Sequence, residues 1–407
     1  MSKNILLILL SALFVQSAYS HEPIADYRSK TILADQSFLD ALKIPMTYRH
    51  EKTGLGVATI TPIMEAKISA GAHLLHKCAG YETISDDSLK RSDGVVKDLD
   101  TLAAIIASDA FYLQSPMKKV VVTPKAEIQT AIDEVSAQNL KEWVTWLSSF
   151  ESRYNRAKDP NVHVVQMQQR IEGLLQGTKW TYKIDLIDHT STKQKSIRLR
   201  LEGTDLKDEV IVMGGHLDSI SGMFGSGKAP GADDNASGSS NLIEALRIIS
   251  QRAPTRRSIE FFWYAGEESG LLGSAEIAKK YKADARNVRA VLQLDMTLHP
   301  GSGHLVIGNV QDYTTAWLKD YLVDINSTYL KVTLIPDECG YACSDHASWY
   351  KNGYPTLMPF EANTETMNSN IHTPKDVINQ MSDFEHSAVF SKIAVIFALD
   401  LGNTEIH

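Results

Sequence analysis

Residues 209–215, EVIVMGG, form the apolar run that decides the fold. A run without polar alternation is typical of a strand that is buried on both faces of a sheet. Around it lie two strand patterns with alternating apolar residues, one helix pattern and a further apolar strand. In chain order these are WTYKIDLID (180–188), KSIRLRLEG (195–203), SSNLIEALRIIS (239–250) and SIEFFWYA (258–265).

Strand and helix patterns continue to alternate toward the C-terminus. We expect helices at 128–150, 271–281, 315–325 and 386–402, and strands at 288–296, 331–335 and 355–359. Strands separated by helices over this length predict an α/β fold, with a mixed, mostly parallel β-sheet flanked by helices on both faces.

Composition excludes some partners. The chain has 407 residues, 43% of them hydrophobic, which is enough for a sizeable core. The formal net charge is −8, which argues against a surface for nucleic acid or anionic membranes. We expect a monomer.

The N-terminal region predicts export. Residues 1–20 combine Lys3, an apolar stretch and small residues before Ser20, as in a secretory signal peptide. The apolar stretch is too short to span a bilayer. We therefore expect a secreted protein without a membrane segment after signal removal, exported through the periplasm if the source is Gram-negative. Residues 21–120 are interpreted as a prosegment, with a permanent N-terminal domain as the alternative, and residues 121–407 as the main globular domain.

Three cysteines fit an oxidising compartment. Cys339 and Cys343 lie in CGYAC, close enough for a disulfide across a tight loop. A CxxxC pair can also bind metal, but no second cysteine pair exists to complete a sulfur site. Cys78 remains unpaired.

Acidic and histidine residues follow one predicted strand after another. Ligands of such sheets bind outside the carboxyl ends of the strands. Two histidines and several carboxylates at that edge match the ligand set of a two-metal site. They are His216, Asp218, Asp233, Asp234, Glu267, Glu268, Asp295 and His372. Taken singly, each has a structural explanation: Asp233 and Asp234 could cap a helix, His216 could be a core histidine, and His372 could lie in a surface loop.

Two other motifs do not carry chemistry. GMFGSGKA (222–229) approaches the phosphate-binding loop, but Ala229 replaces the metal-binding hydroxyl and Pro230 follows instead of a helix. Ser344, Asp345 and His346 are consecutive, so their side chains point in different directions, and no GxSxG motif occurs in the chain.

Six motifs in order resemble the secreted bacterial leucyl aminopeptidases of the M28 metallopeptidase family. They are GGHLDS (214–219), PGADDNASG (230–238), AGEESGLLGS (265–274), LQLDM (292–296), CGYACSDHASW (339–349) and IHT (371–373). The resemblance covers about residues 121–407. It implies the zinc-exopeptidase form of the predicted fold, two Zn²⁺ ions per chain and release of apolar N-terminal residues from peptides.

The resemblance also assigns roles. Asp234 would bridge both metals, His216 and Asp295 would complete one ion, and Glu268 and His372 the other. Asp218 would orient the imidazole of His216, and Asp233 would stay outside the metal ligands. Glu267 would be the general base, taking a proton from the metal-bound water and returning it to the leaving amine.

Substrate contacts follow from the same motifs. A Cys339–Cys343 disulfide would stiffen the loop that presents Tyr341 to the oxyanion, although a purely structural disulfide is the alternative. Met296, Tyr341, Ile371 and Met367 would line an apolar pocket, with core packing as the alternative for Met296 and Ile371. Secreted relatives tend to place aromatic residues between PFE (359–361) and the last histidine. This chain has none there, so Thr364 and Met367 predict a more open pocket and put a strict leucine preference in doubt.

Other activities remain possible on this fold. A glutaminyl cyclase need not hydrolyse peptide bonds, so an assay separates it from a peptidase. A carboxypeptidase would need a basic pocket, and the metal motifs contain no Arg or Lys. A binding ectodomain without catalysis would be expected to lose ligands or the base, whereas all six positions are filled.

Overall fold

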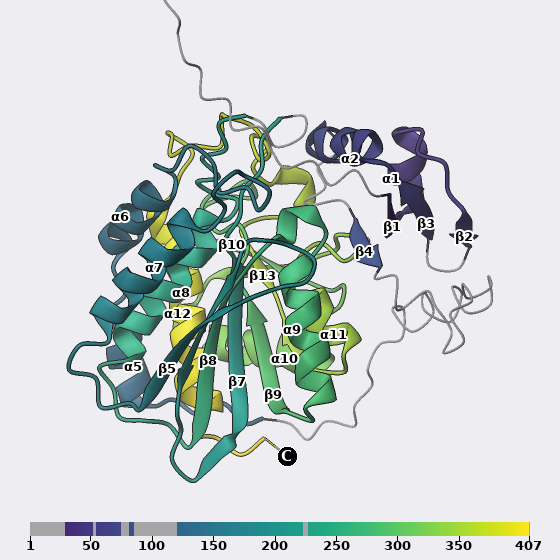
Figure 1. Ribbon diagram of the computed structural model, residues 1–407. Coiled ribbons are helices and arrows are strands. Elements are labelled where there is room, and N and C mark those ends of the chain that lie inside the picture. The colour runs from purple at the N-terminus through teal and green to yellow at the C-terminus, as the bar shows by residue number, and fades with distance from the viewer. Residues whose placement is uncertain (1–28, 52–53, 75–80, 85–119, 223–226, 407) are drawn as a thin grey trace, which may run out of the picture.

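The computed structural model describes residues 29–51, 54–74, 81–84, 120–222 and 227–406 (Figure 1). The predicted signal peptide and Cys78 lie outside the described residues, as do residues 223–226 of the phosphate-loop-like motif. The described chain forms an α/β domain from residue 120 onward and a smaller N-terminal unit, residues 30–84.

A six-stranded sheet forms the centre of the α/β domain. Its strands run in the order β12–β9–β7–β8–β6–β5. The first four are mutually parallel. β6 pairs antiparallel with β8, and β5 pairs antiparallel with β6. The prediction of a mixed, mostly parallel sheet is confirmed. The strands are β5 (Tyr182–Ile187), β6 (Ser196–Leu201), β7 (Leu206–His216), β8 (Arg257–Tyr264), β9 (Asn287–Gln293) and β12 (Thr356–Leu357).

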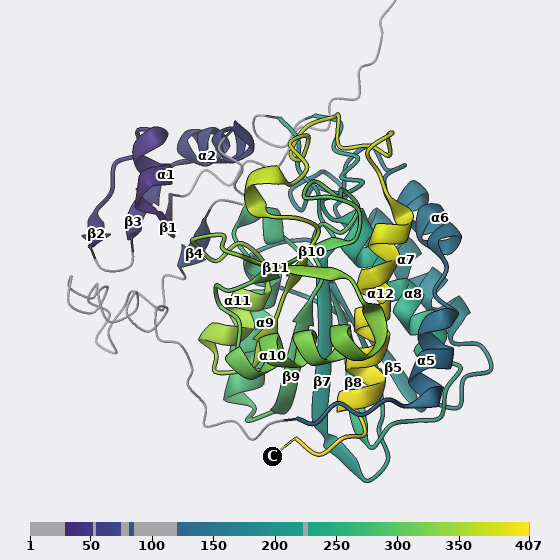
Figure 2. The same cartoon turned by 180° about the vertical axis from the view of Figure 1, so that it is seen from behind.

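Helices cover both faces of this sheet, as Figures 1 and 2 show from opposite sides. Alternate residues of β7 point to opposite faces. Ile211 and Met213 belong to the larger core, which is formed with α5 (Ala126–Asp133), α6 (Ala137–Leu147), α7 (Val162–Leu174), α8 (Ala236–Ile249), α10 (Ala316–Ile325) and α12 (Phe384–Leu401). Val210 and Val212 pack in a second core with α9 (Leu272–Ala283) and α11 (His346–Lys351).

Several elements differ from expectation. The single helix expected over 128–150 is two helices, because Ser136 caps α6 by accepting the backbone N–H of Asn139. Helices α7 and α11 were not predicted, nor was β10 (Val306–Val310). β10 joins β11 (Thr333–Asp337) and β13 (Pro359–Phe360) in a small second sheet. Short helical turns η2 (Glu267–Ser269), η3 (Asn326–Leu330) and η4 (Thr364–Thr366) complete the domain.

The N-terminal unit is a four-stranded antiparallel sheet in the order β2–β3–β1–β4. The sequence shows few strong strand patterns here, because β2 (Tyr48–His50) and β4 (Glu82–Ile84) are too short to display an alternation. The longer strands are β1 (Lys30–Asp35) and β3 (Leu55–Ile60), and the helices are α1 (Gln36–Ala41) and α2 (Pro62–Leu74). Across the described residues, no helix combines the length and apolarity that crossing a membrane requires.

Candidate metal centre

Parallel strands bring the predicted ligands together. β7 ends at His216, the turn after β8 leads into η2 with Glu268, and Asp295 follows β9 closely. Asp234 lies two residues before α8, and His372 comes from the long segment before α12. Because β7, β8 and β9 are parallel neighbours, their carboxyl ends meet at one edge of the sheet.

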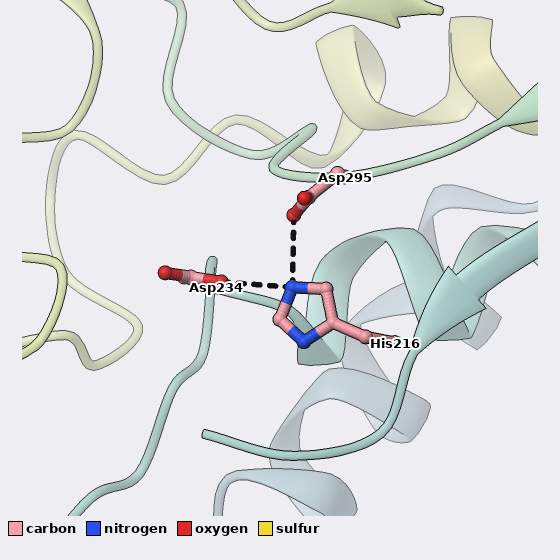
Figure 3. Close-up of side chains that lie close together, drawn as sticks. All are labelled: His216, Asp234 and Asp295. Atoms are coloured by element: carbon pink, nitrogen blue, oxygen red, sulfur yellow. Dashed lines mark hydrogen bonds and ion pairs between the residues drawn. The ribbon is translucent and has the colours of Figure 1, made fainter. Parts of the chain in front are cut away.

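His216 lies at the centre of a first group of ligand atoms. Its Nε2 is 3.1 Å from Oδ1 of Asp234 and 3.2 Å from Oδ1 of Asp295. Figure 3 shows this ring nitrogen directed at both carboxylates. These donor atoms lie close enough to hold one metal ion.

A second group shares Asp234 with the first. The Oδ2 of Asp234 is 3.2 Å from Nε2 of His372, and that nitrogen is 2.9 Å from Oε2 of Glu268. These three residues also lie close enough to hold an ion. The two oxygens of Asp234 therefore face different groups, which is the geometry a carboxylate needs to bridge two cations.

The nitrogen and oxygen atoms of these groups are better suited to bind a metal ion than to bind one another. Nε2 of His372 and Oε1 of Glu268 are buried and have no hydrogen-bond partner among the described residues, although the two side chains are in contact. Uncompensated buried charge is costly, and a cation placed among these atoms would compensate it. Imidazole nitrogen and carboxylate oxygen are donors that zinc accepts.

Burial perturbs the acids at this edge. It raises the pKa of Glu268 to about 7, aided by the charge of Asp234. It also raises the pKa of Glu267 well above its ordinary value, more than the nearby His216 lowers it. The pKa of Asp234 is lowered despite burial, because His216 and His372 stabilise its charge. Glu267 is thus an acid with enhanced proton affinity beside the metal groups.

Asp218 supports the loop of the two adjacent glutamates. Its carboxylate accepts the backbone N–H of Glu267 at 3.0 Å and that of Glu268 at 3.3 Å. Nδ1 of His216 lies 3.1 Å from the backbone oxygen of Asp218 and 3.6 Å from its carboxylate. The main chain of Asp218 therefore contacts the imidazole most closely, while its side chain holds η2.

Asp233 lies outside both groups. Its carboxylate accepts the backbone N–H of Leu298 and the side-chain N–H of Asn368, each at 3.0 Å.

Sequence reasoning missed residues that contact the ligands, among them Ser344 and Asp376. Ser344 donates its hydroxyl hydrogen to Oδ2 of Asp295 at 2.6 Å. Asp376 accepts the backbone N–H of Asp234. Ser344 was considered only as part of a Ser–Asp–His run, and in the structure the ring of His346 contacts the backbone of Asp312. An acid four residues after His372 was the available signal for Asp376.

Arg153 was also not predicted. It is 1% exposed and donates to four backbone carbonyls. Those of Leu217 and Gly231 are each 2.9 Å away, and Leu147 and Pro230 supply the other two. Leu217 follows His216, and Gly231 lies in the loop that leads to Asp234, so one guanidinium links the two loops.

The predicted pocket residues lie together in one apolar cluster. Met296, Tyr341, Met367 and Ile371 are all buried there beside a Cys339–Cys343 disulfide. The hydroxyl of Thr364 donates to Asp337. Met367 thus lies in the apolar cluster, and Thr364 is held by a polar contact.

Known proteins are similar to this chain. Residues 196–396 match the model of peptidase family M28. The chain is 35% identical over 288 residues to a probable leucine aminopeptidase of Trichophyton verrucosum, covering 69% of this chain and 77% of the relative. It is 34% identical over 289 residues to leucine aminopeptidase 1 of Arthroderma otae, covering 67% and 76%.

A solved structure is similar over nearly the whole chain. The LapA aminopeptidase of Legionella pneumophila superposes with a TM-score of 0.79 at 27% identity, covering 95% of this chain and all of that chain. LapB of the same organism, at 24% identity and a TM-score of 0.78, shares the fold. The resemblance drawn from the motifs is confirmed: the chain belongs to peptidase family M28 and is a metalloaminopeptidase.

Proposed function

We propose that this chain is a secreted di-zinc aminopeptidase that removes apolar, leucine-like residues from the free N-terminus of peptides. The observation that carries the proposal is the sharing of Asp234 between two ligand groups, with Glu267 beside them. Oε2 of Glu267 is 4.0 Å from Nε2 of His216, and Oε1 has no hydrogen-bond partner among the described residues.

In this proposal, His216 and Asp295 would hold one zinc ion, Glu268 and His372 would hold the other, and Asp234 would be shared between the two. Bound ions would supply acidification of a water molecule and polarisation of the substrate carbonyl. Glu267 takes a proton from the attacking water at Oε1 and gives it to the nitrogen of the leaving amine.

Two further groups would act on the substrate. The Tyr341 hydroxyl donates to the developing oxyanion, and the Cys339–Cys343 disulfide restrains the loop that carries it. Met296, Met367 and Ile371 surround the first side chain of the substrate. Secretion rests on the predicted signal peptide.

Hydrolysis of leucine p-nitroanilide tests the proposal, using folded protein from which the predicted signal and prosegment have been removed by limited proteolysis. We expect cleavage of the free-amine compound but not of its N-acetylated form. A chelator should abolish the cleavage and zinc should restore it. Failure of zinc-loaded, folded protein to cleave would overturn the proposal. Substrates for cyclisation and for C-terminal hydrolysis would then be assayed.

A further inference from the structure

The loop that carries Tyr341 is fastened by a residue from outside it. Oδ2 of Asp312 accepts the backbone N–H of Cys339 at 2.6 Å and that of Gly340 at 3.2 Å. Cys339 and Gly340 immediately precede Tyr341. Asp312 lies 27 residues before Cys339, in the connection between β10 and α10. It therefore fixes where the loop begins.

The end of the same loop is fastened to the same residue. Nε2 of His346 lies 3.1 Å from the backbone oxygen of Asp312. Burial lowers the pKa of His346 to about 4, so its ring is uncharged at neutral pH. Because a backbone oxygen can only accept a hydrogen bond, the hydrogen of this ring is on Nε2. Asp312 thus holds the segment 339–346 at both ends.

The residue after Asp312 contacts the middle of the loop. Tyr313 packs against an apolar cluster that contains Ala342, the residue directly after Tyr341. The φ of Tyr313 is 49°, in the left-handed region that residues other than glycine rarely adopt. Such a conformation persists only where the surrounding structure determines it.

Both chain neighbours of Asp312 are tied to strands. The N–H of Gln311 donates to the backbone oxygen of Asp337 in β11 at 2.8 Å. The hydroxyl of Thr356 in β12 donates to the backbone oxygen of Tyr313 at 2.6 Å. β11 belongs to the small sheet and β12 to the central sheet, so Asp312 is anchored to both sheets.

A carboxylate at this position has an energetic cost. Burial raises the pKa of Asp312, and the charges of Glu338 and Asp337 add to this effect, while the N–H groups of Gly340 and Cys339 oppose it. Hydrogen bonds to a charged acceptor are stronger than those to a neutral one. The two N–H groups of the loop therefore gain from the charge that burial disfavours.

We propose that Asp312 is a positioning residue, which holds Tyr341 where its hydroxyl reaches the oxyanion. This proposal rests on the proposed function and on the role of Tyr341 in it. The Cys339–Cys343 disulfide restrains the shape of the loop, whereas Asp312 restrains its place against the sheets. Hydrogen-bond donors to an oxyanion act over a narrow range of distances, so a small shift of the loop would remove the donor.

The test uses the folded, proteolysed and zinc-loaded protein of the leucine p-nitroanilide assay. Asp312→Ala removes the acceptor. We expect kcat to fall by about 10- to 100-fold, with KM within about threefold of the parent and unchanged zinc content. Asp312→Asn keeps one oxygen that can accept both N–H groups, so it should restore kcat to within about fivefold of the parent.

Tyr341→Phe identifies the residue through which Asp312 acts. Alone, it should lower kcat by about 100-fold or more. In its presence, Asp312→Ala should lower kcat by less than about twofold, because both changes remove the same interaction. A merely structural role for Asp312 would lower kcat by the same factor with and without Tyr341→Phe.

Asp383→Ala is the matched control. One oxygen of Asp383 likewise accepts two backbone N–H groups, those of Glu385 and His386, each at 3.0 Å at the start of α12. Its loss should lower the melting temperature and leave kcat unchanged.

A further readout does not depend on activity. A thiol reductant opens the disulfide of the loop, and mass spectrometry after alkylation gives the rate. This rate should rise at least about threefold in Asp312→Ala, because the loop opens more often, and stay parental in Asp383→Ala.

The outcomes separate the two proposals. A parental kcat in Asp312→Ala or in Tyr341→Phe, or losses that multiply when the two are combined, overturns the positioning role and leaves the aminopeptidase intact. If the parent does not cleave, the proposed function is overturned, and the reduction rates decide whether Asp312 holds the loop. If Asp312→Ala does not fold, the smaller loss in Asp312→Asn is combined with Tyr341→Phe and decides in the same way.

Discussion

The carboxylate of Asp376 accepts the backbone N–H of Asp234, with Oδ2 3.0 Å from the nitrogen. Its other oxygen accepts the N–H of Asp233 at the same distance. One buried carboxylate thus holds both backbone amides. One of these amides belongs to Asp234, whose side chain is shared by the two metal groups. Asp376 therefore fixes the main chain from which Asp234 reaches both groups.

Asp376→Asn should weaken zinc binding, because one of its acceptor oxygens becomes an N–H donor facing another N–H. We expect a loss of about 10- to 100-fold in zinc affinity, measured by competition with a chromogenic chelator. Asp400→Asn is the control. Asp400 is equally buried but contacts Lys125 and Tyr321, so its loss should lower stability and leave zinc affinity unchanged. Equal zinc affinities in the two variants would contradict the assignment.

Arg153→Met should destabilise the chain and also loosen the metal site. It removes hydrogen bonds to the loops after His216 and before Asp234, at a cost of at least about 3 kcal/mol in the free energy of unfolding. Urea unfolding and zinc titration are the two measurements.

Arg257→Met provides a matched comparison for Arg153→Met. Arg257 is also 1% exposed and donates to backbone carbonyls, those of Leu401 and Thr404, at the opposite end of the sheet. We expect a similar loss of stability but unchanged zinc affinity. A variant of Arg153 with parental zinc affinity would limit Arg153 to a role in folding.

The variants Glu267→Gln and Glu268→Gln should distinguish the general base from the metal ligand, although the two residues are adjacent. Glu267→Gln removes the proton acceptor, so we expect kcat to fall by about 10²- to 10⁴-fold with two zinc ions retained. Glu268→Gln should lose one zinc ion, since Glu268 belongs to the second group. Zinc content by mass spectrometry under native conditions, together with kcat, tests both. Loss of zinc from the Glu267 variant would place that residue among the ligands.

The ion pair of Glu65 should resist mild acid. Burial opposes its charge, but hydrogen bonds and charge from Arg156, with Lys30, lower the pKa of Glu65 from 4.5 to about 2. A lowered pKa in the folded state contributes stability above the unfolded value, and this contribution disappears as pH falls through the folded value. The stability contribution of Glu65 is therefore complete above about pH 4.5 and is lost between about pH 4.5 and 2.

The size of the effect follows from this shift, at about 3 kcal/mol. The difference in melting temperature between the parent and Glu65→Gln should be constant from neutral pH to about pH 5 and shrink below it. A difference that already shrinks near pH 6 would show that the carboxylate is not shielded as described. Acidification alone should not release the N-terminal unit at mildly acidic pH.

The sequence by itself determined the central sheet and the site residues at its edge. The apolar run at 209–215 and the alternating segments around it specify strands locally, and parallel strands bring their carboxyl ends to one edge. That is why residues as distant as His216 and Asp295 were predicted to meet. The break between α5 and α6 was missed because the apolar period continues through it, and only the cap at Ser136 marks it.

The tertiary structure alone decided which main-chain and side-chain groups hold the ligands and what covers the pocket. Asp376 contacts Asp234 across 142 residues, and Arg153 reaches Gly231 across 78. The apolar face of Leu33 and Val57 looks like ordinary core until the structure shows Tyr341 in the same cluster. Periodicity reports which residues are buried, but the partner that buries them is set by packing between distant segments, which local sequence patterns do not encode.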